Sequence, residues 1–101
     1  MSKLPENELA SIKDMIEGGR HLVPEYMWDG LERWFLEGVP SGHFLRALLD
    51  NDLMEAFSRA DGTNQRNMHN YALFLYNYAP RGSYGSPANC KAWQAKHGEA
   101  E

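Results

Sequence analysis

Proline and glycine divide this sequence into short segments, and the segments between them repeat apolar residues every three or four positions. That spacing places apolar side chains on one side of a helix, whereas a half-buried strand needs strict alternation. Helices are expected between Pro5 and Gly18, between Pro24 and Gly38, and over residues 63–79 before Pro80. With no alternating segment and no hairpin signal, the sequence predicts an all-α fold.

Three shorter helices complete the prediction. Ser41 and Asp52 have the residue types that cap helices over residues 41–50 and 52–60, and Thr63 would cap the long helix. Ser86 followed by Pro87 predicts the N-cap and first position of a last helix, which would turn Cys90 and Trp93 inward. The sequence therefore predicts a compact bundle of five or six short helices.

The apolar stripes of the later helices predict which side each one buries. In the helix over 52–60, three apolar residues fall on one side; in the helix over 63–79, five residues share one face. The first set is Leu53, Met54 and Phe57, and the second is Met68, Tyr71, Ala72, Leu75 and Ala79.

Chain length limits the number of domains. A chain of 101 residues is too short for two independent cores, and 43% hydrophobic residues are enough for one. A single helical domain over residues 1–101 is expected, with a frayed tail at residues 98–101.

The charge distribution argues against nucleic acid. The net charge is −4, and acids outnumber bases 12 to 6 over residues 1–62. A helix-turn-helix made by segments 41–50 and 52–60 would bring Asp52, Glu55 and Asp61 toward phosphates, with Arg59 alone opposing them. DNA is therefore not an expected partner.

Other features predict a cytoplasmic protein. No run of residues approaches the about 18–20 apolar residues that a membrane span needs. The first six residues resemble no secretory signal, and the single cysteine, Cys90, fits a reducing compartment. A cytoplasmic location without membrane association is the expectation.

Catalytic and metal-binding signals are weak. The four histidines, at positions 21, 43, 69 and 97, lie apart from one another, and none has a second ligand at zinc-site spacing. Cys90 lies near the start of a helix, where thiol pKa values fall, but its place in the apolar pattern favours a buried side chain. The prediction is a non-enzymatic protein with no metal and no cofactor.

Polar residues near the predicted turns are candidates for a binding pocket. The candidates are Asn51, Asp52, Asp61, Asn64, Asn77, Ser83 and Ser86. In one interpretation each caps a helix or closes a turn. In the other, loops at one end of the bundle converge on a polar pocket rimmed by Tyr76, Tyr84 and Arg81.

Aromatic residues next to the apolar stripes are candidate contacts for a partner. Binding hot spots favour Trp, Tyr and Arg. On this ground Tyr26, Trp28, Tyr78 and Tyr84 are candidate anchors, although Trp28 is also a candidate for the core.

From Pro24 to Trp93 the sequence resembles a widespread set of small bacteriophage and prophage proteins. The resemblance rests on an ordered series of motifs, and it implies an accessory role in a phage or prophage. The helix before Pro24, within residues 1–22, would be an addition to that set, and relatives often carry Trp in place of Tyr84. The motifs are GVPSG at 38–42, FLRALLDNDL at 44–53, AD at 60–61 with Asn64, YNYAP at 76–80 and GSP at 85–87.

Two functions follow as hypotheses. The first is a small helical binding module that engages, and inhibits or modulates, a host or viral protein in the bacterial cytoplasm. The alternative is a sponge for a nucleotide-like signalling molecule, stacked on Tyr84 or Tyr76 with its phosphate near Arg81 and the Gly85–Ser86 turn. A homo-oligomer is compatible with either function.

Overall fold

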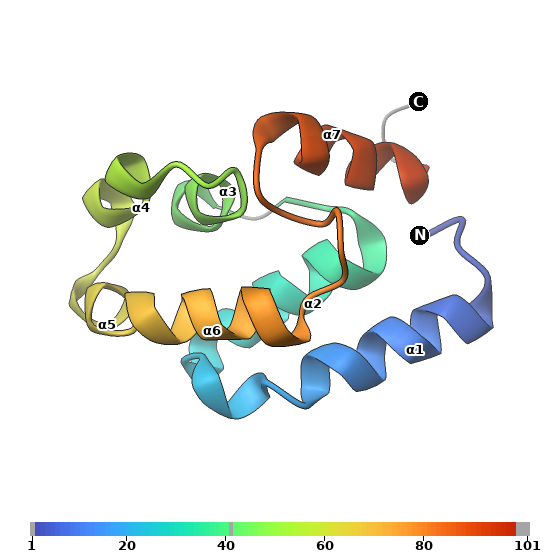
Figure 1. Cartoon of the computed structure of the whole chain (residues 1–101), viewed down its shortest axis with the longest axis horizontal. Helices are drawn as coiled ribbons and strands as arrows, with labels where there is room; N and C mark the ends of the chain where they lie inside the picture. Colours follow the sequence, from blue (N-terminus) through green and yellow to red (C-terminus); the bar gives the residue numbers. More distant parts are fainter. Residues whose placement is uncertain (1, 41, 99–101) are drawn as a thin grey trace.

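The computed structural model describes residues 2–40 and 42–98, and over these residues the chain is all-α (Figure 1). This part of the chain contains seven α-helices, two short 3-10 helices and no strand, so the all-α prediction is confirmed and the expected count of five or six helices is too low. The elements are α1 (Glu6–Glu17), η1 (Arg20–Leu22), η2 (Glu25–Met27), α2 (Trp28–Glu37), α3 (His43–Leu49), α4 (Leu53–Arg59), α5 (Gly62–Arg66), α6 (Met68–Tyr78) and α7 (Pro87–Lys96).

The extra helix arises at Asn67, where the single helix expected over 63–79 is divided into α5 and α6. The Asn67 side chain donates a hydrogen bond to the Thr63 carbonyl at 2.8 Å, and such local side-chain bonds compete with the helical backbone pattern. The Thr63 cap is also wrong. Asp61 caps α5 instead, its carboxylate accepting from the Asn64 amide at 2.8 Å.

Most other helix ends lie where the sequence places them. Gly38 ends α2 in the left-handed conformation at φ 72°, and Asp52 caps α4 by accepting from the Glu55 amide. Ser86 accepts from the Asn89 amide at 3.1 Å, immediately before α7 begins. The Ser41 cap and the tail at 99–101 lie outside the described residues.

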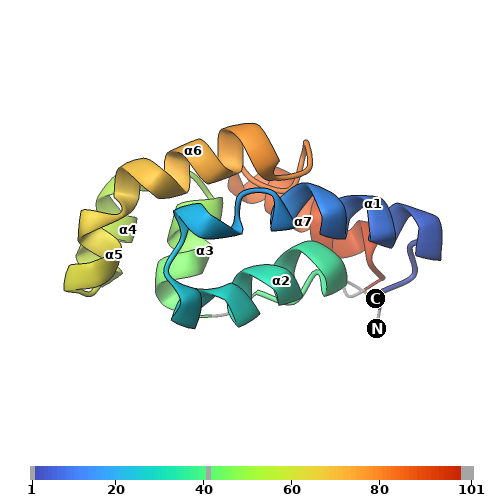
Figure 2. The same ribbon diagram turned by 90° about the horizontal axis from the view of Figure 1, so that it is seen from below.

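The helices pack around one apolar core. α1 lies along α2 and also contacts α6, while α3 and α4 form a closely packed pair (Figures 1 and 2). Ile12 and Ile16 are buried, so α1 contributes to this core. α2 and α6 contribute the largest side chains, including Trp34, Phe35, Tyr71 and Phe74, and α7 adds Cys90 and Trp93 as predicted.

Trp28 also belongs to the core, which corrects its prediction as an exposed anchor. Its side chain is 2% exposed, packs edge-on against Phe74 with ring centres 6.0 Å apart, and is covered by the Arg20 guanidinium at 5.0 Å. Trp28 is the first residue of α2, and the Arg20 that covers it is the first residue of η1.

The two ends of the described chain meet. The Lys3 amide donates to the His97 carbonyl at 3.1 Å, which fixes the start of the chain beside the end of α7. Among the described residues, no helix has the length and apolar character to cross a membrane.

Candidate functional site

α4 carries its apolar side chains on the outside of the molecule. Its apolar side, predicted from Leu53, Met54 and Phe57, is exposed, with Met54 reaching 79%, while Ala56 is the buried residue of this helix. α4 packs against α3 with Ala56 as its buried residue, so the prediction that the side carrying Leu53, Met54 and Phe57 is buried is wrong.

α6 presents an uncharged surface. The helix contains no Asp, Glu, Lys or Arg, and its exposed positions are His69, Ala72, Leu73, Tyr76 and Asn77. The buried face differs from the predicted one, because Phe74 joins Tyr71 and Leu75 inside while Ala72 faces outward. An exposed helix normally carries charged residues on its outer face, so this surface has the character of a contact surface.

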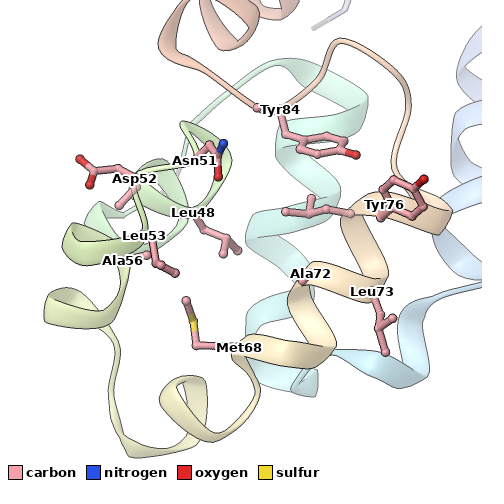
Figure 3. A pocket seen from close by; sticks show the side chains of 13 residues that line it. Leu48, Asn51, Asp52, Leu53, Ala56, Met68, Ala72, Leu73, Tyr76 and Tyr84 are labelled. Carbon is pink, nitrogen blue, oxygen red and sulfur yellow. The ribbon is translucent and has the colours of Figure 1, made fainter.

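The two helices border one groove with a volume of about 500 Å³, which we call the α4–α6 groove. In Figure 3, Leu53 and Ala56 lie on one side, Ala72, Leu73 and Tyr76 lie on the other, and Met68 and Tyr84 mark opposite ends. Its lining is Ala47, Leu48, Asn51, Asp52, Leu53, Ala56, Met68, Ala72, Leu73, Leu75, Tyr76, Tyr84 and Gly85.

The Tyr84 end of the groove is fastened to the core by hydrogen bonds. The Gly85 amide donates to the Leu49 carbonyl at 2.8 Å, and the Asn89 side chain donates to the Tyr84 carbonyl at 3.0 Å. The carbonyl of the preceding residue, Ser83, accepts from the buried Trp34 indole at 2.9 Å. The loop that carries Tyr84 is therefore held in place by hydrogen bonds within the chain.

Apart from the tyrosine hydroxyls of Tyr76 and Tyr84, the polar side chains of the groove lie at the α3–α4 turn. Asn51 occupies the left-handed conformation at φ 64°, and Asp52 follows it with an exposed carboxylate. No Lys or Arg lines the groove. Its chemistry is therefore apolar with one negative edge, which suits an apolar or cationic group better than an anion.

Four of the predicted pocket residues are brought together in this groove: Asn51, Asp52, Tyr76 and Tyr84. Arg81 is exposed but does not line it, so the groove differs from the predicted polar pocket that Arg81 would rim. Ser83 is fully buried and donates to the Pro80 carbonyl, while Ser86 caps α7; both have structural contacts.

Another group of predicted residues forms a separate hydrogen-bonded cluster. Tyr26 donates to the Asp61 carboxylate at 2.5 Å, and the buried Tyr71 donates to the Asn64 side chain at 2.6 Å. The hydrogen bond from Tyr26, with the Asn64 amide, lowers the pKa of Asp61. Asp61 thus caps α5, as the capping interpretation expects, whereas the Asn64 side chain is buried and accepts from Tyr71 instead of capping a helix.

Tyr78, the remaining predicted anchor, is half-buried. Its ring stacks on Phe74 with centres 6.5 Å apart, and it covers Gly19, where an added Cβ would lie 2.5 Å from the ring. This contact holds the end of α6 against the turn after α1.

Leu53, Ala72 and Leu73 also line the groove, and none of them is among the predicted binding residues. The sequence contains one signal for this surface: the eleven residues of α6 include no charged residue, so the exposed side of this helix cannot be a charged face.

Chemically reactive groupings are sparse. Within the described residues, no group of three or more His, Cys, Asp or Glu side chains could hold a metal ion. Burial, with a hydrogen bond to Asp50, raises the pKa of the Cys90 thiol to about 12, so the nucleophilic thiolate is disfavoured. Cys90 therefore has the properties of a core residue.

No protein-family model, curated protein or solved structure matches this chain.

Proposed function

We propose that this chain is a non-enzymatic accessory protein of phage or prophage type that binds a host or viral protein in the bacterial cytoplasm. The observation that carries the proposal is the α4–α6 groove, bordered by exposed apolar side chains on both helices.

The composition of this surface is that of a protein contact. Cores of protein interfaces are depleted in charged residues and enriched in aromatic residues and methionine. Tyr76 is 83% exposed on the uncharged helix α6, and Leu53 on the other wall of the groove is 60% exposed, so leaving this surface in water is unfavourable. A partner protein that covered this surface would remove that cost, and the partner's own activity would be inhibited or modulated by the binding.

The proposal of a phage or prophage protein rests on the segment from Pro24 to Trp93, which resembles small bacteriophage and prophage proteins. That resemblance supports an accessory role, and the groove supports binding as the way in which the role is carried out.

The second candidate function is a sponge for a small signalling molecule. A volume of about 500 Å³ is within the range of small-molecule pockets, and Tyr76 and Tyr84 could stack against a base. A nucleotide would also bring phosphates, however, and the groove offers Asp52 and no cationic side chain. This chemistry favours the protein-binding proposal.

Affinity capture from bacterial lysate tests the proposed function with a matched pair of variants. Leu73 and Met15 are exposed to similar extents, 37% and 42%, but only Leu73 lines the groove. We expect one stoichiometric protein to be retained by the wild type and by Met15→Glu and to be lost by Leu73→Glu. Equal retention by both variants would contradict the groove assignment, and a nucleotide-sized ligand without a protein would favour the sponge.

A further inference from the structure

We infer that the α4–α6 groove receives an amphipathic α-helix of the partner, with an uncharged apolar stripe and a cationic side chain at the end that meets Asp52. The inference rests on the proposed function and names the kind of segment that the partner must supply.

The shape of the groove fits a helix. Its two walls are themselves helices, and Met68, Ala72 and Tyr76 follow one another on α6 at intervals of four residues. Such rows form the ridges that pack into the grooves of a second helix. The small side chain of Ala72 leaves a notch between two large ones, so a large apolar residue of the incoming helix would lie over Ala72.

The length of the groove sets the number of contacts. From Met68 to Tyr76 the rise along α6 is about 12 Å, at 1.5 Å per residue. Apolar residues at positions i, i+4 and i+7 of an incoming helix cover about 10 Å. Three anchors from two turns of helix therefore match the exposed length of α6.

Charge limits the identity of the incoming helix. Glu55 is already paired with Arg59 at 2.7 Å, and α6 has no charged residue. Among the described residues Asp52 forms no ion pair, and no other charged residue of this part of the chain lines the groove. The apolar stripe must therefore be free of charge, and a lysine or arginine beside it is favoured where the helix passes Asp52.

A second copy of this chain fits less well. A second copy could insert α6, which has no lysine or arginine to pair with Asp52, or α4, which has Asp52 and Glu55 at its start. Inserting α4 would bring carboxylates toward Asp52 in a protein whose net charge is already −4. A separate basic amphipathic segment avoids this repulsion.

Two designed peptides test the inference on the full-length protein. Each has about 14 residues and a hydrocarbon staple, because free helices of this length are marginal in water. Both carry leucines at i, i+4 and i+7, and the flanking residues are lysines in one peptide and glutamates in the other. Binding is measured by fluorescence anisotropy of a dye on the peptide.

Three variants separate shape from charge. Ala72→Trp fills the notch and should weaken the affinity for the lysine peptide by about tenfold or more. The control variant is Ala92→Trp, at an exposed position of α7 outside the groove, and it should bind this peptide as tightly as the wild type does. Asp52→Asn should reduce the preference for lysine over glutamate by about two- to fivefold. Asn caps helices about as well as Asp, so α4 is retained in that variant.

The inference is overturned if neither peptide binds the wild type with a Kd below about 1 mM, or if Ala72→Trp binds the lysine peptide as tightly as the wild type does. It is also overturned if sedimentation shows a wild-type dimer that Leu73→Glu dissociates, since a second copy would then occupy the groove. If neither peptide binds but the wild type captures a protein from lysate that Leu73→Glu does not retain, the inference is wrong and the proposed function is still supported. Peptide binding without any captured protein would instead contradict the proposed function.

Discussion

The indole nitrogen of Trp34 donates a buried hydrogen bond of 2.9 Å to the carbonyl of Ser83, joining the middle of α2 to the loop before α7. Trp93 in turn donates to the Trp34 carbonyl at 3.0 Å, which ties α7 to the same helix. Because Tyr84 follows Ser83 directly, this pair of bonds fixes one end of the α4–α6 groove from the opposite side of the core.

Trp34→Phe should destabilise the protein more than Trp28→Phe. Both tryptophans are 2% exposed, but among the described residues the Trp28 indole nitrogen has no hydrogen-bond partner, so its replacement loses no bond. Leaving the Ser83 carbonyl unsatisfied should make the Trp34 variant less stable by about 1–3 kcal/mol relative to the Trp28 variant. Urea unfolding followed by circular dichroism measures the difference, and equal losses would show that the bond contributes little.

Tyr76→Ala and Tyr78→Ala should separate binding from stability on a single helix. Tyr76 is exposed, so its loss should change the unfolding free energy by no more than about 0.5 kcal/mol while weakening partner binding. Tyr78 packs on Phe74 and Gly19, so its loss should cost about 2 kcal/mol or more. Thermal unfolding gives the stabilities and capture from lysate gives the binding. Retention of the partner by a folded Tyr76→Ala protein would remove this residue from the contact surface.

Gly38→Ala should be more harmful than Gly82→Ala. Both glycines have positive φ, 72° and 81°, and that conformation alone costs an alanine about 1–2 kcal/mol. At Gly38 the new Cβ would also lie 2.9 Å from the His97 Cβ, whereas nothing lies within 4 Å at Gly82. The clash should add about 1–3 kcal/mol in urea unfolding. Similar losses would mean that the end of α7 moves aside freely.

Cys90 should react slowly with a thiol reagent in the folded protein at pH 8 and rapidly in urea. Burial raises its pKa from 9.0 to about 12, so the folded state favours the neutral thiol. The sign follows from this shift: the stabilising contribution is complete below pH 9 and is lost as the pH rises toward 12. Absorbance of the released thiolate of Ellman's reagent measures the rate, and equal rates in both conditions would contradict the burial of Cys90.

The sequence by itself determined the helical class and most helix ends. Gly38, Asp52, Ser86 and Pro87 act locally, through backbone conformation and a side chain three residues from its partner, so their effect needs no knowledge of the rest of the fold. The break at Asn67 is also local, but a side-chain bond to Thr63 is only one of several conformations open to an asparagine.

Only the tertiary structure decided which side of each helix is covered. Spacing placed Leu53, Met54 and Phe57 together on α4, but whether that side meets the core depends on how α4 packs against α3, and in the structure Ala56 is its buried residue. Tyr76 and Tyr78 are two residues apart and have similar local sequence, yet one is exposed and the other packs on Gly19. Helical periodicity shows which side chains share one face of a helix. Packing between helices far apart in sequence determines whether that face meets the core or the solvent.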